Sequence, residues 1–346
     1  MWKRALDRAG VRDARLRRDY GEQRRAVRKF ATAEYAAARL LLPAGMLPHV
    51  VAAVAFMHDT DDRIDRGTPE ERAAALTAWD GLVRKALAEG DSDLPVLRSL
   101  AHTAEHHPAL RGHVDDFMRG CAREVAWRTI ADDEELRLYV REYSLPALLL
   151  TAGLLAPEDA PTRAAFTEGC HLLIRSMQRV DFLEDLAEDV RAGRPGVPAD
   201  AVARHGADLT RPGPGLAALV AEQADRAAAD LAAAAPLPTL VAPPYRPFVR
   251  ALVGVQRLRL DAVRHAGASL SLRPSGPRPR PPPGCCSGRR CGGCGRDPRR
   301  RGRPGAGGAA GGGVLFRSRG RGVVCGLRSG GEPSAVDQAT TLKEHT

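Results

Sequence analysis

The feature that most constrains the fold is an acidic run inside a helical segment. Residues 178–189 read Gln-Arg-Val-Asp-Phe-Leu-Glu-Asp-Leu-Ala-Glu-Asp, without Gly or Pro, in a longer apolar-periodic segment. This pattern predicts one long helix over residues 161–192. Asp181, Asp185 and Asp189 are spaced four apart, so they would form one row along that helix, where like charges repel. A row of carboxylates facing a concave interior calls for cations, and hard divalent ions prefer oxygen ligands.

A second acidic group lies far upstream, in the segment Phe56–Asp65. Asp61 and Asp65 are again four residues apart, at the end of a strongly apolar helix predicted over residues 47–64. If both helices face one cavity, two carboxylate clusters oppose each other across it. Because Mg²⁺ is usually bound by a few carboxylates together with substrate phosphates, the two groups predict a site in which Mg²⁺ holds a diphosphate.

The two groups resemble the paired Asp-x-x-x-Asp motifs of the squalene/phytoene synthase family. Asp61 to Asp65 matches the first motif. The segment Asp185–Asp189 matches the second, including its Glu-Asp ending, and Gln178 stands where the family carries a Gln. A Glu-Leu-x-x-Tyr pattern of the family is matched by Glu135–Tyr139. The resemblance covers roughly residues 25–265.

The resemblance implies an all-α fold: a single-domain helical bundle of about ten helices around a central cavity, over residues 29–270. Residues 1–28 are rich in Arg and Asp with little apolar face, which predicts an exposed N-terminal arm or helix. It implies Mg²⁺ as the cofactor and a prenyl diphosphate as the substrate. The expected metal ligands are the acids of both motifs and their neighbours, namely Asp61, Asp62, Asp65, Asp185, Glu188 and Asp189.

Ionising an allylic diphosphate also requires groups that hold the phosphates and a pocket that shelters the carbocation from water. In the family, the first core helix carries side chains that touch the diphosphate, and here that helix is predicted over residues 30–42. The candidate diphosphate-binding residues are Tyr35, Arg39, Arg175, Gln178 and Arg191. The helices over 47–56 and 145–155 would supply the apolar walls, and Pro146 should kink the second of them.

Three positions depart from the family pattern. His58 stands where an Arg usually precedes the first motif, Asp181 replaces an Asn, and Glu184 replaces an Arg. The site has lost positive charge, which favours one pyrophosphate over two. The main expectation is therefore transfer of the prenyl group to a non-isoprenoid small molecule, such as an electron-rich aromatic ring, in secondary metabolism.

In that reaction His58, Asp181 or Glu184 would act as the catalytic groups that position or deprotonate the acceptor. Two alternatives remain open: head-to-head condensation of two prenyl diphosphates, and cyclisation of one. A further alternative is a catalytically inactive assembly partner.

The positive charge of the chain lies at its C-terminal end. The net charge is +10 over 346 residues. Residues 273–346 hold fifteen Arg and Lys against four Asp and Glu, a net +11, which leaves the rest near −1. The segment 271–346 is rich in Gly, Pro and Arg, which predicts a disordered tail, and it also resembles a GC-rich gene read out of frame.

The near-neutral body argues against a nucleic-acid partner. The chain starts with a charged segment and has no long apolar run, so a cytoplasmic protein is expected. An apolar prenyl chain would still favour peripheral contact with a membrane. The sequence does not indicate an oligomeric state.

Overall fold

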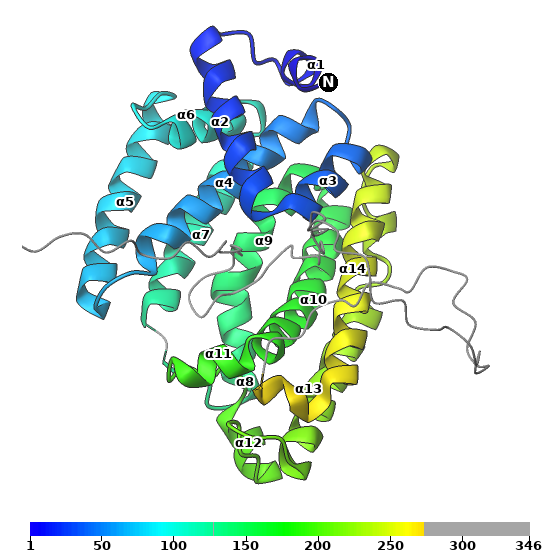
Figure 1. The fold of residues 1–346 in the computed structure, drawn as a ribbon. Coiled ribbons are helices and arrows are strands. Elements are labelled where there is room, and N and C mark those ends of the chain that lie inside the picture. The colour runs from blue at the N-terminus through cyan, green and yellow to red at the C-terminus, as the bar shows by residue number, and fades with distance from the viewer. Residues whose placement is uncertain (127, 273–346) are drawn as a thin grey trace, which may run out of the picture.

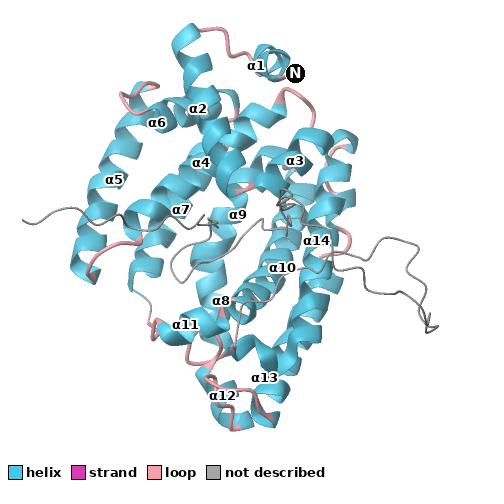
Figure 2. Ribbon diagram, in the orientation of Figure 1, coloured by secondary structure: helices cyan, strands magenta, loops and turns pink. Residues whose placement is uncertain are grey.

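The computed structural model describes residues 1–126 and 128–272, and in them every regular element is helical (Figures 1 and 2). The all-α prediction is confirmed, with more helices than the ten expected. In chain order the α-helices are α1 (Trp2–Arg8), α2 (Ala14–Phe30), α3 (Thr32–Leu41), α4 (Met46–Ile64), α5 (Pro69–Glu89), α6 (Pro95–His106), α7 (Leu110–Ala126), α8 (Asp133–Tyr139), α9 (Leu145–Ala152), α10 (Ala160–Glu184), α11 (Leu186–Arg191), α12 (Ala199–His205), α13 (Pro214–Ala233) and α14 (Arg246–Ala266). The predicted tail lies outside the described residues from 273 onward.

The core is built around α4 and α10. Most residues of α4 are buried, as its nearly continuous apolar sequence requires, because a helix that is apolar all round must be covered on every side. Helices α2, α5, α6 and α9 pack around α4, and α13 and α14 pack along α10. Figure 1 shows α9 and α10 in the middle, with α5 and α6 on one side and α14 on the other.

Residues 1–28, predicted as an exposed arm or helix, form α1 and most of α2. Leu6, Val11 and the fully buried Tyr20 pack together against Ala52 of α4. The N-terminal segment is thus part of the packed helical body. Within the described residues, no helix is both long enough and apolar enough to cross a bilayer.

The long helix predicted over 161–192 is wrong in one respect, because it breaks at Asp185. Helix α10 ends at Glu184, Asp185 has φ −92° and ψ 4°, and α11 begins at Leu186. The break follows Asp181 and Glu184, which a buried arginine from α14 holds in place. The three aspartates therefore do not continue in one straight row, and Asp189 lies on a separate short helix.

Candidate functional site

The first acidic motif occupies the C-terminal end of α4. Asp61 is only 3% exposed; its Oδ1 accepts a hydrogen bond from the Tyr143 hydroxyl at 3.2 Å, and its Oδ2 has no hydrogen-bond partner. Burial, and then the charge of Asp65, raise the pKa of Asp61 well above its usual value. Asp65 is half-buried, and Asp62 is exposed, 3.8 Å from Nε2 of His58. Asp61 is thus the inward-facing acid of this motif.

A π-helical turn over Val140–Ser144 links the two motif helices. It ends two residues before Pro146, whose missing N–H removes one α-helical hydrogen bond, so the predicted kink takes the form of a wider turn. Tyr143 of the turn reaches Asp61, while Ser144 Oγ donates to Oε1 of Gln178 at 2.8 Å. Gly120 allows α7 to pack closely against the π-helical turn, since a Cβ at that position would lie 2.2 Å from the Glu142 carbonyl oxygen.

The second motif starts at the break between α10 and α11. Asp185 and Asp189 are 1% and 3% exposed, and Glu188 is half-buried. Oδ1 of Asp189 has no hydrogen-bond partner. Burial first, and then the charge of Glu188, raise the pKa of Asp189 to about 7, against the opposing effect of Arg194.

A carboxylate that the sequence did not single out lies between the motifs. Glu124 of α7 is 3% exposed, accepts a hydrogen bond from the Tyr139 hydroxyl at 2.7 Å, and lies 3.6 Å from Arg194. Its charge contributes to the raised pKa of both Asp61 and Asp189. The two motifs, far apart in sequence, therefore border one acidic region around Glu124.

The acids of this region are suitable ligands for a hard cation, but they do not form a complete coordination shell. Among the described residues, no group of three or more His, Cys, Asp or Glu is arranged to hold a metal ion. Yet each motif presents one buried carboxylate oxygen without a partner, Asp61 Oδ2 and Asp189 Oδ1. Such oxygens fit Mg²⁺, which takes a few carboxylates and completes its shell with water and substrate phosphates.

Two of the three predicted catalytic groups, Asp181 and Glu184, form ion pairs with one buried arginine, Arg259; we call these three residues the ion triad. Arg259 of α14, 1% exposed, contacts Asp181 through Nη2 and reaches Glu184 through Nη2 at 2.5 Å and Nε at 3.4 Å. Because the guanidinium contacts oxygens of both carboxylates, Asp181 and Glu184 are less available to position or deprotonate an acceptor. Arg259 was not among the predicted site residues; the available signal was an arginine in the mostly apolar buried stripe of α14, where Gln256 is the other polar residue.

His58, the third predicted catalytic group, is half-buried. Its ring lies against Phe30, with centroids 3.8 Å apart. Burial lowers its pKa, against the opposing charges of Asp62 and Asp59, so the ring is neutral near pH 7. Its Nδ1 has no hydrogen-bond partner. A neutral imidazole one turn before Asp62 can accept a proton.

The predicted diphosphate-binding residues do not all gather at the acids. Gln178 contacts the π-helical turn through Ser144. Arg175 instead pairs with Asp230 of α13 at 2.6 Å, and Arg191 is exposed. Tyr35 and Arg39 lie on α3, beside a basic surface groove that no acid of either motif lines.

Two other cations lie closer to the acids. Arg72 of α5 is 6% exposed, its Nη2 donates to the Val125 carbonyl, and its Nε has no hydrogen-bond partner. Arg194 follows α11 and pairs with Glu124. The pKa of Arg72 is lowered by burial and then by the charge of Arg194, whereas Glu124 and Asp65 oppose the shift. Arg72 and Arg194 are therefore the cations best placed beside the two motifs.

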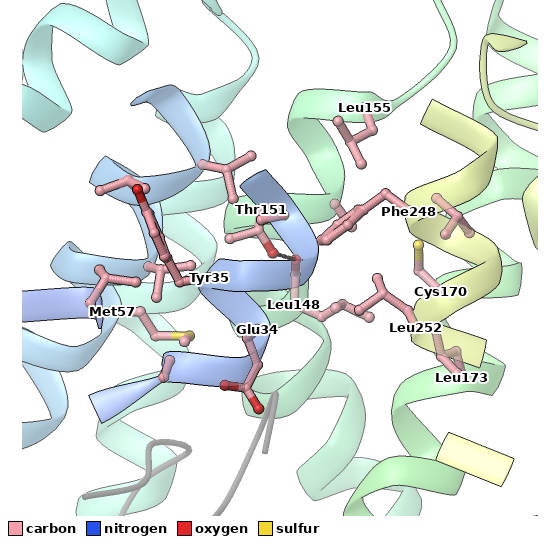
Figure 3. Close-up of a pocket in the computed structure, with 18 of the residues that line it drawn as sticks. Glu34, Tyr35, Met57, Leu148, Thr151, Leu155, Cys170, Leu173, Phe248 and Leu252 are labelled. Carbon is pink, nitrogen blue, oxygen red and sulfur yellow. Dashed lines mark hydrogen bonds between the residues drawn. The ribbon is translucent and has the colours of Figure 1, made fainter. Parts of the chain in front are cut away.

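An apolar cavity of about 80 Å³ begins one helical turn from the first motif (Figure 3). Met57 lines it, and Asp61 follows on the next turn of α4. The cavity lies between α3, α4, α9, α10 and α14, with Tyr35 on one side and Phe248 and Leu252 on the other. The helices expected to supply the apolar walls do so, through Val50, Val51, Val54, Leu148 and Leu155 among others.

The described residues thus combine two acidic helix ends in an all-α body with an apolar cavity that begins one helical turn from the first of them. A family model described as squalene/phytoene synthase matches residues 29–281, and the chain belongs to that family. The resemblance seen in the sequence is confirmed.

Relatives and solved structures agree with this assignment. The chain is 29% identical over 207 residues to the bifunctional protein CrtB/UppS of Streptomyces coelicolor, covering 58% of this chain and 35% of that protein. It is 30% identical over 198 residues to the phytoene synthase of Mycobacterium tuberculosis, covering 54% and 63%. The matches thus span about one to two thirds of these relatives' lengths.

Two solved structures share the fold. Squalene synthase HpnC from Alicyclobacillus acidocaldarius has a TM-score of 0.66 at 23% identity, covering 77% of this chain and 99% of that one. A dehydrosqualene synthase in complex with a ligand has a TM-score of 0.66 at 21% identity, covering 73% and 88%.

Proposed function

We propose that this chain is a Mg²⁺-dependent prenyltransferase that joins two prenyl diphosphates head to head, with release of both pyrophosphates and of two protons. The observation that carries the proposal is the pair of buried carboxylate oxygens without partners, one from each motif, with an apolar cavity that begins one helical turn from the first motif. Membership of the squalene/phytoene synthase family supports head-to-head condensation, and nothing in the comparisons supports the non-isoprenoid acceptor expected from the sequence.

In the proposed site, Asp61, Asp65, Asp185 and Asp189 hold Mg²⁺, with Asp62 and Glu188 at its edge. When bound, Mg²⁺ neutralises the charge that develops on the departing pyrophosphate. Further positive charge comes from Arg72 and Arg194, which lie between the motifs.

The remaining groups orient the site and exclude water. Tyr143 holds Asp61 by its hydroxyl, and Arg259 fixes the helix end that carries Asp185. The apolar cavity beyond Met57 takes the prenyl chain and keeps water from the allylic cation. We propose residues 29–270 as the catalytic unit.

A second candidate is transfer of one prenyl group to a non-isoprenoid acceptor. The observation in its favour is that Arg259, a cation at the second motif, is already neutralised by Asp181 and Glu184. A site with fewer available cations holds a second pyrophosphate less well. His58 is then the remaining candidate for the base, since its ring is neutral and has a nitrogen without a partner.

Product mass distinguishes these reactions. The purified chain is incubated with Mg²⁺ and farnesyl or geranylgeranyl diphosphate, with and without a pool of aromatic acceptors. The proposal predicts a hydrocarbon skeleton with twice the prenyl carbons and no need for an acceptor. A product seen only with an acceptor would establish the second candidate, a product with the carbon number of one substrate would indicate cyclisation, and absence of Mg²⁺-dependent turnover would refute all three.

A further inference from the structure

A basic groove lies on the surface formed by the end of α2 and by α3. It has a volume of about 400 Å³ and is lined by Arg25, Arg28, Lys29, Thr32, Tyr35, Ala36 and Arg39. We call this surface the basic groove. None of the acids of the two motifs lines it, so it is separate from the proposed metal site.

The cations of the basic groove are not neutralised within the described residues. No ion pair involves Arg25, Arg28, Lys29 or Arg39 there, whereas Arg84, exposed on α5, pairs with Asp80 at 2.7 Å. Arg28 lies over the Tyr35 ring, 5.9 Å from its centroid, and Arg39 Nε lies 3.2 Å from Met1 Sδ. Four positive charges therefore stand together on a body whose net charge is near −1.

The basic groove and the apolar cavity lie on two sides of α3. Tyr35 lines both, and Glu34 lines the cavity from the same helix (Figure 3). Phe30 and Ala31, just before that helix, also line the cavity. Helix α3 is thus the wall between the cavity and this surface. Leu40, next to Arg39, is 78% exposed, so the charged surface also carries a large apolar side chain in solvent.

We propose that the basic groove and Leu40 form a docking surface for an anionic lipid bilayer, which places the wall of the apolar cavity against the membrane. Arg and Lys near such a surface are attracted to its phosphates, and an exposed Leu gains by entering the acyl boundary. Nucleic acid fits less well, because stacking platforms for bases need exposed aromatic rings and Tyr35 is only 8% exposed. The proposal goes beyond the catalytic function, since docking needs no turnover.

The test is sedimentation of the full chain with phosphatidylcholine vesicles, with and without phosphatidylglycerol. Binding should require phosphatidylglycerol and weaken with salt. The variant R25Q/R28Q/K29Q should bind about a hundredfold more weakly, at about fivefold per charge removed. The control R84Q/K85Q/R119Q removes the same charges from exposed positions of α5 and α7 and should bind like the parent. Residues 273–346 are present in every variant, so their charge cancels in the comparison.

Leu40→Ser provides a second, independent variant. It should leave the salt dependence unchanged and weaken binding several-fold, because it removes only the apolar contribution. Equal binding by the two triple variants would overturn the proposal. So would full displacement from vesicles by inorganic phosphate or by a single-stranded oligonucleotide, which would assign the groove to those ligands. Vesicle binding as predicted in a protein that forms no coupled product would refute the proposed function and leave the docking surface standing.

Discussion

The buried arginine of α14 supports the sharpest test of how the second motif is held. Arg259 is 1% exposed, and both its partners, Asp181 and Glu184, are also buried. Arg259→Met keeps the bulk of the side chain and leaves two buried carboxylates without their counter-charge. Removing one partner of a buried ion pair typically costs about 3–5 kcal/mol, a large share of the roughly 5–15 kcal/mol that stabilises a domain.

The assay is urea unfolding of Arg259→Met beside a control on the same helix. Arg264→Met breaks an exposed pair with Asp225, with atoms 2.6 Å apart, and should cost less than about 1 kcal/mol. Adding Asp181→Asn and Glu184→Gln to Arg259→Met should recover most of the lost stability, because no unpaired charge then remains. If Arg259→Met and Arg264→Met cost the same, the account of the ion triad is refuted.

Three further predictions follow from burial and close contacts. Burial lowers the pKa of His49 to about 3 and that of His102 to about 4. Because these folded-state values lie below the unfolded value, stability is full above about pH 6.5 and by pH 5 has fallen by about 2 kcal/mol through His49, and by a smaller amount through the partly exposed His102. His49→Gln should therefore remove at least half of the loss measured by urea titrations at the two pH values. Gly120→Ala should destabilise the fold by about 1–3 kcal/mol, because the new Cβ would clash with the π-helical turn. Gly112→Ala, on the same helix, adds a Cβ in open space and should be neutral or stabilising by up to about 1 kcal/mol. Thermal melts that give the two variants equal stability would contradict this. Asp189→Asn should stabilise the metal-free protein by about 1–3 kcal/mol, because it removes a carboxylate whose charge is disfavoured by burial. The same substitution should abolish Mg²⁺-dependent turnover. A variant that is less stable than the parent, or still active, would count against the site.

The sequence predicts the helical class and the two motifs because these depend on local pattern. Apolar periodicity marks α4 and α10, and four-residue spacing selects Asp61 and Asp185. The break at Asp185 could not be predicted, since it accompanies contacts with an arginine 74 positions further along the chain. Ion pairs between distant helices, such as Arg175 with Asp230, could not be predicted either, because the sequence of one helix face does not show which helix packs against it.

Residues that act through distant contacts were missed for the same reason. Arg72 lies on α5 and Glu124 on α7, and only the packing of these two helices, with Arg194 beside Glu124, brings the three residues together. Tyr35 and Arg39 were placed at the diphosphate by family resemblance, whereas the structure puts them at the wall of the apolar cavity and the basic groove. Whether they also touch a diphosphate remains a prediction.

The most direct measurement of the central claim is calorimetric titration of inorganic pyrophosphate into the protein, with and without Mg²⁺. The account predicts binding only when Mg²⁺ is present, and its loss in either Asp61→Asn or Asp185→Asn, because each motif contributes ligands to the same ions. Pyrophosphate binding that needs no Mg²⁺ and survives both substitutions would contradict it.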